Sequence, residues 1–431
     1  MKRLVGRIAF LMVLAVINSA YAENIQKIKI SYIAQERKIP AALSNLDDFV
    51  QYKGMQGAEI AIADNNTTGQ FTGQKFELNK VVVPVDGDII QLFKQQVTDD
   101  ITLVISNLPA VQLKQLADLD SAKDKLFFDA TTSDDDLRNE QCRQNVLHML
   151  PSRSMRADAL AQYMMKKRWN KWFLVTGMTK EDKLYAKAIK RAASRFGMTL
   201  VKEKQWTHTY DARRTAQLDV PVFTQGADYD VLVVADEQGL FGEYFEYRSW
   251  IPRPVIGTQG LVPTAWHETH EQWGAVQIQN RFKKVAGRGM HEQDYAAYLA
   301  GRSIGEAAVR TKSNQLQMIK SYLMGDEFAL QGYKGKPLSF RAWNGQLRQP
   351  VLLAAARSLV AVAPVEGFLH PKTELDTLGY DQPESACNQG EVSEKTLPTT
   401  INKTELNNSE STVQKIIQRL KNYYNKFNGN K

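Results

Sequence analysis

Apolar residues recur along the chain in two alternating patterns, short continuous runs and stretches with helical spacing. The runs predict strands at 28–34, 81–85, 101–106 and 126–130. Between them, apolar residues three or four positions apart predict helices at 52–65, 87–99 and 110–119. Strands this apolar are buried on both faces, and their alternation with helices is typical of a parallel sheet covered by helices. The first part of the chain therefore predicts a βαβ architecture.

The same alternation starts again after Pro151. Ala157, Leu160, Ala161 and Met164 share one helix face, and a second apolar helical stripe runs from Tyr185 to Phe196. Further strands are predicted at 172–176, 231–235 and 254–258. A long helix follows at 292–310, and 338–353 has the pattern of a hairpin that turns at Asn344-Gly345. The restart predicts a second lobe with its own sheet.

The two ends of the chain differ from this pattern. Lys2, Arg3 and Arg7 precede an apolar run at 8–17 and the small residues Ala20 and Ala22, which is the pattern of a secretory signal peptide. The run is too short to span a bilayer, so we expect cleavage after Ala22 and export to the periplasm; a buried N-terminal helix is the alternative.

The last part of the chain is polar and then amphipathic. Residues 388–410 have almost no apolar content and predict a flexible linker. Residues 411–431 place apolar side chains at helical spacing, opposite a basic side. This predicts an amphipathic helix that docks on a protein groove or an anionic membrane surface, or that folds back on its own lobe or frays.

Length and charge narrow the class of protein. A chain of 431 residues with 43% hydrophobic residues is too long for one ordinary core and predicts two domains. The net charge of +8 includes the three basic residues of the signal, so the remaining surplus is mild and gives no sign of nucleic-acid binding. Its two cysteines, Cys142 and Cys387, can form a disulfide in an oxidising compartment; two free thiols are the alternative.

At the level of longer segments, the chain resembles the type I periplasmic binding proteins, the branched-chain amino-acid and amide class of transporter receptors. The similarity is carried by 149–177 (MLPSRSMRADALAQYMMKKRWNKWFLVTG) and 180–201, where Tyr185 is retained and Ala186 replaces a glycine. A narrower segment, 367–387 (GFLHPKTELDTLGYDQPESAC), is similar to a binding-protein subfamily associated with quinoprotein (PQQ-dependent) alcohol dehydrogenase systems.

The resemblance implies an α/β fold of two doubly wound parallel-sheet lobes, joined by three crossings. The expected division is a signal at 1–22, lobe 1 at 23–149 and 262–336, lobe 2 at 150–261 and 337–387, a linker at 388–410 and a helix at 411–431. It also implies a periplasmic solute-binding protein that carries a small polar molecule to an ABC permease of the inner membrane. The alternative is a sensor or accessory partner of the dehydrogenase that takes no part in transport.

The ligand of such a fold lies between the lobes, and parallel sheets place ligand sites beyond the carboxyl ends of their strands. In lobe 1 this selects Ser106, Asn107, Thr131, Thr132 and Ser133. In lobe 2 it selects Tyr185, Asp236, Glu237 and Gln259.

Several of these residues also have structural interpretations. Ser133 can cap a helix, Tyr185 can belong to a core, and Asp236-Glu237 can form a surface turn. Gln259 stands where amino-acid receptors of the family tend to have a carboxylate for the ligand's ammonium. This departure argues against an α-amino acid, unless Asp236 or Glu237 replaces that carboxylate.

Enzyme motifs are missing from the sequence. It has no G-x-S-x-G, no P-loop and no glycine-rich dinucleotide fingerprint after the first strand. His267 and His270 are three residues apart, unlike the four-residue spacing of zinc proteases, and Trp266 beside them is a candidate aromatic wall of the cleft. We therefore expect a binding protein without catalytic residues, metal or cofactor.

Overall fold

A computed structural model describes residues 25–38, 49–207 and 212–387 of the chain. The chain divides into two compact units, 1–390 and 391–431, and every described residue lies in the first. The expected signal peptide, linker and C-terminal helix lie outside the described residues and stay predictions.

The first lobe is built on a five-stranded parallel sheet in the order β2-β1-β3-β4-β5. Its strands are β1 (Gln26–Gln35), β2 (Gln74–Val83), β3 (Leu103–Asn107), β4 (Leu126–Asp129) and β5 (Val146–His148). Alternate residues serve opposite faces: Leu103 and Ile105 belong to one core, while Val104 between them belongs to another. This accounts for the continuous apolar run, because helices cover both faces.

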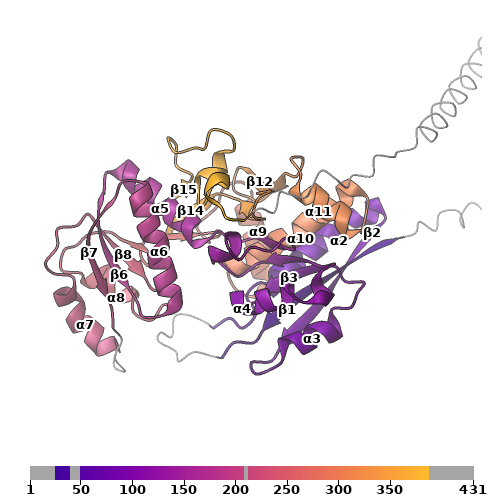
Figure 1. The fold of residues 1–431 in the computed structure, drawn as a ribbon, viewed down its shortest axis with the longest axis horizontal. Coiled ribbons are helices and arrows are strands. Elements are labelled where there is room, and N and C mark those ends of the chain that lie inside the picture. Colours follow the sequence, from indigo (N-terminus) through magenta and orange to yellow (C-terminus); the bar gives the residue numbers. More distant parts are fainter. Residues whose placement is uncertain (1–24, 39–48, 208–211, 388–431) are drawn as a thin grey trace, which may run out of the picture. The chain divides into compact units, whose positions relative to one another are not determined.

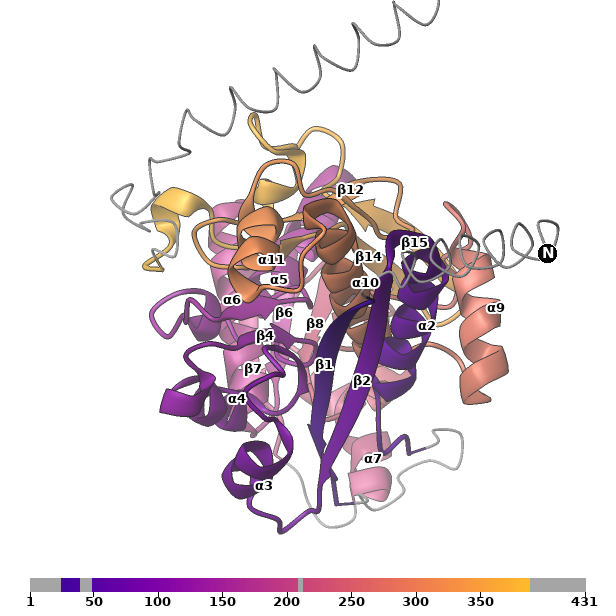
Figure 2. The same cartoon turned by 90° about the vertical axis from the view of Figure 1, so that its right-hand side faces the viewer.

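Six helices form those two layers (Figures 1 and 2). The larger core joins the sheet to α2 (Met55–Thr72), α9 (Ala275–Ala286), α10 (Glu292–Thr311) and α11 (Leu316–Met324). The smaller core joins it to α3 (Ile89–Gln96) and α4 (Ala110–Ala117). The backbones of α2 and α10 approach closely: a Cβ at Gly301 would lie 2.6 Å from the Ala61 Cβ, and one at Gly57 would lie 1.9 Å from the Asp294 carbonyl oxygen.

The second lobe repeats the arrangement with a parallel sheet in the order β7-β6-β8-β9. Its strands are β6 (Lys171–Thr176), β7 (Thr199–Gln205), β8 (Val231–Ala235) and β9 (Val255–Gly257). The helices are α5 (Arg153–Lys167) and α6 (Lys180–Arg195) on one face, and α7 (Ala212–Phe223) and α8 (Glu243–Arg248) on the other. The α/β fold with parallel-sheet lobes, expected from the sequence, is confirmed.

Two small antiparallel sheets accompany the lobes. One contains β10 (Val262–Thr264), β14 (Val351–Ala355) and β15 (Ser358–Ala363), and the other contains β11 (Leu330–Gln331), β12 (Pro337–Phe340) and β13 (Leu347–Arg348). The hairpin at Asn344-Gly345 is present, with Gly345 at φ 67°, but its paired arms are only β12 and β13.

The chain passes between the two lobes three times. Leu150 belongs to the core of the first lobe and Met155 to that of the second; a return lies between Ile256 and Ala265. The third passage lies between Leu347 and Val351, since Leu338 and Phe340 still pack in the first lobe. The hairpin strands β12 and β13 thus pair with β11 rather than with β14, and the expected bounds of the two lobes stay predictions.

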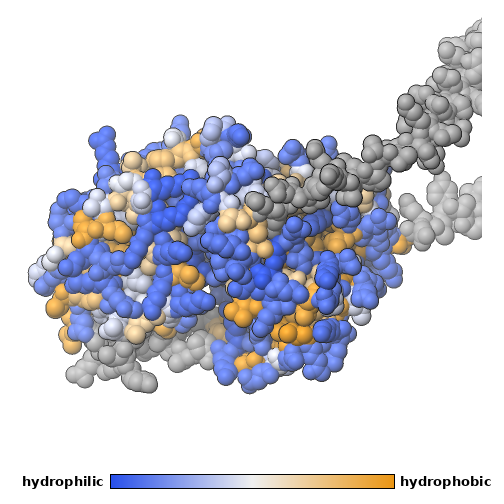
Figure 3. All heavy atoms as spheres, in the orientation of Figure 1, coloured by the Kyte–Doolittle hydropathy of each residue, from blue (hydrophilic) through white to orange (hydrophobic). Residues whose placement is uncertain are grey.

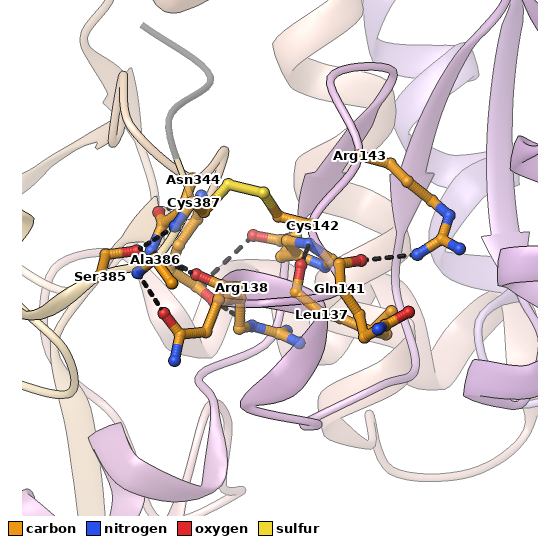
Figure 4. Close-up of a disulfide and its surroundings, with 12 residues drawn as sticks. Leu137, Arg138, Gln141, Cys142, Arg143, Asn344, Ser385, Ala386 and Cys387 are labelled. Atoms are coloured by element: carbon orange, nitrogen blue, oxygen red, sulfur yellow. Dashed lines mark hydrogen bonds between the residues drawn. A yellow bond between two sulfur atoms is a disulfide. The ribbon is translucent and has the colours of Figure 1, made fainter.

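Cys142 and Cys387 form a disulfide, with their Cα atoms 5.8 Å apart, as expected from the sequence (Figure 4). Around it, the Ser385 hydroxyl and the Asn344 amide both donate to the Arg138 carbonyl, at 3.4 Å each. The bond thus fastens the end of unit 1 to the loop that follows β4.

Hydrophobic side chains lie mainly inside these cores. The face drawn in Figure 3 is mostly hydrophilic, with hydrophobic residues in separate patches. None of the helices in the described part of the chain has the length and apolar character needed to cross a bilayer.

Candidate functional site

A cavity of about 620 Å³ lies between the two lobes and is lined by both. From the first lobe it takes residues 109–111 after β3 and 131–134 after β4. From the second it takes the start of α6 and residues 236–239 after β8. The strand order reverses between β1 and β3 in the first sheet and between β6 and β8 in the second, and loops after β3, β6 and β8 line the cavity. Doubly wound sheets place their ligands at such reversals.

Seven of the nine candidate residues line this cavity. They are Thr131, Thr132, Ser133, Tyr185, Asp236, Glu237 and Gln259. Ser106 and Asn107 are not among the lining residues. Ser106 is fully buried, and the Asn107 amide donates to the Tyr32 hydroxyl at 2.7 Å and to the Lys53 carbonyl.

The loop after β4 is fixed by hydrogen bonds to Asp129, which is completely buried. Its carboxylate accepts the backbone N–H groups of Thr131 and Thr132, at 3.1 and 2.9 Å, and the Thr132 hydroxyl. His148 Nδ1 lies 2.9 Å from the same carboxylate. The Thr131 hydroxyl donates to the Asn107 side chain. Asp129 and Asn107 therefore shape the loop, and both threonine hydroxyls already donate within the protein.

Asp236 closes the turn after β8. Its carboxylate accepts the backbone N–H groups of Leu240, Phe241 and Gly242 at 3.0, 2.8 and 2.7 Å. The side chain is only 2% exposed although it borders the cavity. The structural interpretation of this residue, a turn, thus accounts for all the contacts of its carboxylate.

Two arginines in the first turn of α5 reach the cavity, and neither was among the residues selected from the sequence. Arg153 binds Glu237 through two nitrogens, at 2.6 to 3.0 Å, and Asp134 at 3.1 Å. Arg156 contacts Glu292 at 3.0 Å and the Ser133 hydroxyl at 3.3 Å. Asp134 and Glu292 belong to the first lobe, so both arginines connect the lobes.

Burial and pairing compete at these carboxyl groups. Burial raises the pKa of Glu237, and the opposing effect of Arg153 is smaller. Burial also acts to raise the pKa of Glu292, but Arg156 and hydrogen bonds from Ala265 and Thr264 outweigh it and lower the pKa overall. Two glutamates with the same kind of partner thus have pKa values displaced in opposite directions.

Tyr185 and Gln259 present polar groups to the cavity from the second lobe. The Tyr185 ring is 2% exposed, its hydroxyl has no hydrogen-bond partner among the described residues, and burial raises its pKa. Gln259 is half-buried, and Gly242 leaves it room, because a Cβ there would lie 2.5 Å from the Gln259 Cγ. A buried hydroxyl without a partner is costly, so Tyr185 marks a place where a ligand group can bind.

The histidine pair has local partners instead. His267 Nδ1 lies 2.8 Å from the Thr269 hydroxyl, and His270 Nε2 lies 2.6 Å from the Tyr333 carbonyl. Trp266 stacks on Tyr295 within the core of the first lobe, with ring centroids 4.4 Å apart, and does not line the cavity. Within the described ranges no cluster of three or more His, Cys, Asp or Glu side chains is able to hold a metal.

Comparisons with known proteins agree with the fold described above. A family model described as periplasmic binding protein matches residues 49–214. No curated protein sequence matches the chain.

The similar solved structures include three binding proteins. A branched-chain amino-acid ABC transporter ligand-binding protein from Burkholderia xenovorans is 13% identical with a TM-score of 0.65, covering 84% of this chain and 100% of its own. A periplasmic binding protein from Burkholderia mallei is 15% identical with a TM-score of 0.60, covering 84% and 98%. A leucine-, isoleucine-, valine-, threonine- and alanine-binding protein from Brucella ovis, in a closed conformation, is 14% identical with a TM-score of 0.60, covering 84% and 96%. The described chain thus has the α/β fold of the type I periplasmic binding proteins.

Proposed function

We propose that this protein is the solute-binding component of an ABC transporter, which takes up a small polar molecule between its lobes and delivers it to a membrane permease. The observation that carries the proposal is the cavity itself, which both lobes line at the carboxyl ends of their parallel strands. The family match over residues 49–214 and the ABC transporter ligand-binding protein among the similar structures support it.

Binding is proposed to close the lobes about the three crossings, as in hinge-type receptors. Ser133, Tyr185 and Gln259 are the proposed ligand contacts, because their side chains reach the cavity and retain hydrogen-bonding capacity. Thr131, Thr132 and Asp236 are proposed to shape the walls. The role is one of binding without catalysis: the buried His148, which pairs with Asp129, has its other ring nitrogen 3.1 Å from the Leu137 carbonyl and does not line the cavity.

The proposed location is the periplasm, after removal of residues 1–22. The disulfide supports this location, since such bonds persist in oxidising compartments.

A link to a quinoprotein alcohol dehydrogenase is a second proposal and rests on the resemblance of residues 367–387. Part of that segment is held by contacts within the protein. Asp376 pairs with Arg341 and Arg348 at 2.8 Å each, and the Gly379 N–H donates to Asp158 at 2.8 Å. Leu369 is 46% exposed and is open to a partner. Co-purification of the dehydrogenase with the wild-type protein but not with a Leu369→Asp variant would support the link.

The transport proposal is tested on protein secreted to the periplasm. Native mass spectrometry should find a small molecule bound in a one-to-one ratio, and small-angle scattering should show a smaller radius of gyration when it is present. A protein that carries no small molecule, and whose radius no periplasmic extract changes, would contradict the proposal.

A further inference from the structure

Most of the charges that line the cavity are paired within the protein. Arg153 is shared between Glu237 and Asp134. All three nitrogens of Arg156 have partners: Nη2 contacts Glu292, while Nε and Nη1 donate to the Pro151 and Pro263 carbonyls at 3.2 and 3.3 Å. Both guanidinium charges are thus compensated within the protein, although Arg153 Nη1 pairs with Asp134 without a hydrogen bond to any described residue.

Most of the lining carboxylates are occupied as well. Glu292 also accepts the Thr264 hydroxyl at 2.9 Å and the Ala265 N–H at 3.1 Å. Asp236 accepts its three backbone N–H groups, and Glu237 is engaged by two nitrogens of Arg153. A ligand ammonium would thus have to break one of these interactions. The remaining lining charges, Lys180 and Glu181, are neighbours in the first turn of α6, and Lys180 is exposed.

Most of the polar side chains in the cavity that can still bind a ligand are neutral. The Tyr185 hydroxyl has no partner in the described structure, and the Ser133 hydroxyl accepts from Arg156 but keeps its own proton to donate. Three glutamines complete the set, at positions 238, 259 and 293. Hydroxyls and carboxamides can each both donate and accept hydrogen bonds, which matches a ligand with hydroxyl or amide groups.

On this basis, and given the proposed solute-binding role, we propose that the cavity is built for a small uncharged molecule bearing hydroxyl or amide groups. An amino acid, a carboxylate or an amine would bring a charge into the cleft that finds most of its natural partners taken. Burying an uncompensated charge is far more costly than burying a hydrogen-bonded neutral group. The pairs within the cleft therefore select against charged molecules of the same size.

Three features argue for an anion: the exposed Lys180, Arg153 Nη1, which has no hydrogen-bond partner in the described structure, and the start of α4. Residues 109–111 line the cavity, and no side chain caps this helix, whose first turn contains no acidic residue. The starts of α6 and α10 carry acidic residues in their first turns, which already offset their dipoles. An anion bound at α4 is thus the sharpest opposing outcome.

The test uses matched probes that differ mainly in charge. Propionamide and meso-erythritol are uncharged, propionate is an anion, propylamine is a cation and alanine is a zwitterion. Calorimetric titration of the full exported protein should give an uncharged probe a dissociation constant at least tenfold below those of the charged ones. Its affinity should not change between low and high salt, because screening acts only on charges.

Two substitutions connect that preference to the cavity. Tyr185→Phe should weaken binding of the uncharged probe about fivefold, the effect of one neutral hydrogen bond. Tyr163→Phe is the matched control, since Tyr163 is half-buried on α5 outside the cavity, and it should change nothing. Gln259→Glu adds a carboxylate without an arginine partner and should shift the preference toward propylamine.

The outcomes separate this inference from the proposed function. Tighter binding of propionate, propylamine or alanine overturns the uncharged-ligand inference and leaves solute binding intact. The molecule that mass spectrometry finds in the periplasmic protein gives a second test of the inference. An uncharged molecule supports it, and an ion overturns it. A protein that binds none of the probes and carries no molecule overturns both.

Discussion

Replacing Asp236 by alanine should destabilise the second lobe strongly, although the residue borders a solvent-accessible cavity. The carboxylate accepts three backbone N–H groups, from residues 240, 241 and 242, and the side chain is 2% exposed. Hydrogen bonds to a charged group contribute about 1.5–3 kcal/mol each, so the three sum to at least about 4.5 kcal/mol. Relief from burying the charge offsets part of this, and we expect the free energy of unfolding to fall by about 3 kcal/mol.

Urea denaturation followed by circular dichroism measures this loss. Asp236→Asn should lose less, because its amide oxygen still accepts the N–H groups of Phe241 and Gly242. Asp228→Ala is the control: that side chain is 73% exposed and forms a surface pair with Lys171, so the unfolding midpoint should hardly move. If Asp236→Ala unfolded at the wild-type urea concentration, the three bonds would not stabilise the turn, and the carboxylate would be free for a ligand after all.

Three further predictions concern the scaffold. Cys142→Ser combined with Cys387→Ser should lower the free energy of unfolding by up to about 5 kcal/mol, because the bond closes a sequence separation of 245; an unchanged urea midpoint would refute this. Asn107→Ala should weaken binding of the co-purified molecule and lower the free energy of unfolding by about 1 kcal/mol. The Asn107 amide donates to the Tyr32 hydroxyl and the Lys53 carbonyl and accepts from the Thr131 hydroxyl, so its loss should disturb the loop at Thr131. Equal affinity of the variant and the wild type in calorimetry would refute this supporting role. Deleting residues 391–431 should leave the melting temperature and ligand affinity of the first unit unchanged, because those residues form a separate unit; a large fall in melting temperature would show that the tail stabilises it.

The central strands could be predicted from sequence because burial on both faces leaves a continuous apolar run. The strand β8 (VLVVA) is buried at every position, and its predicted bounds match the structure. The strand β7 (TLVKEKQ) was missed, because it lies at the edge of its sheet and every one of its residues is exposed or half-buried. The rule that detects buried parallel strands therefore fails at an exposed edge strand, where charged residues are tolerated, but not at β9, the opposite edge, which is buried.

The site was predictable to the level of loops but not of side chains. Seven residues selected for following a strand do line the cavity, because the carboxyl ends of parallel strands meet at one edge. The sequence could not show that Asp236 is occupied by the backbone four to six residues later. These hydrogen bonds depend on the conformation of the turn. The sequence Asp236-Glu237 would be the same if both carboxylates lay in an exposed loop.

Arg153 and Arg156 show which part of the site could be predicted from the sequence and which part could not. Both lie in the first turn of α5, where a positive charge opposes the helix dipole and usually lowers stability. Such a pair needs carboxylates close by, and this requirement can be read from the sequence alone. The partners are Asp134, Glu237 and Glu292, which lie up to 136 residues away and come from both lobes. Only the three crossings bring these groups together, so the charge balance of the cleft, and with it the preference for an uncharged ligand, is a property of the assembled fold and not of any one segment.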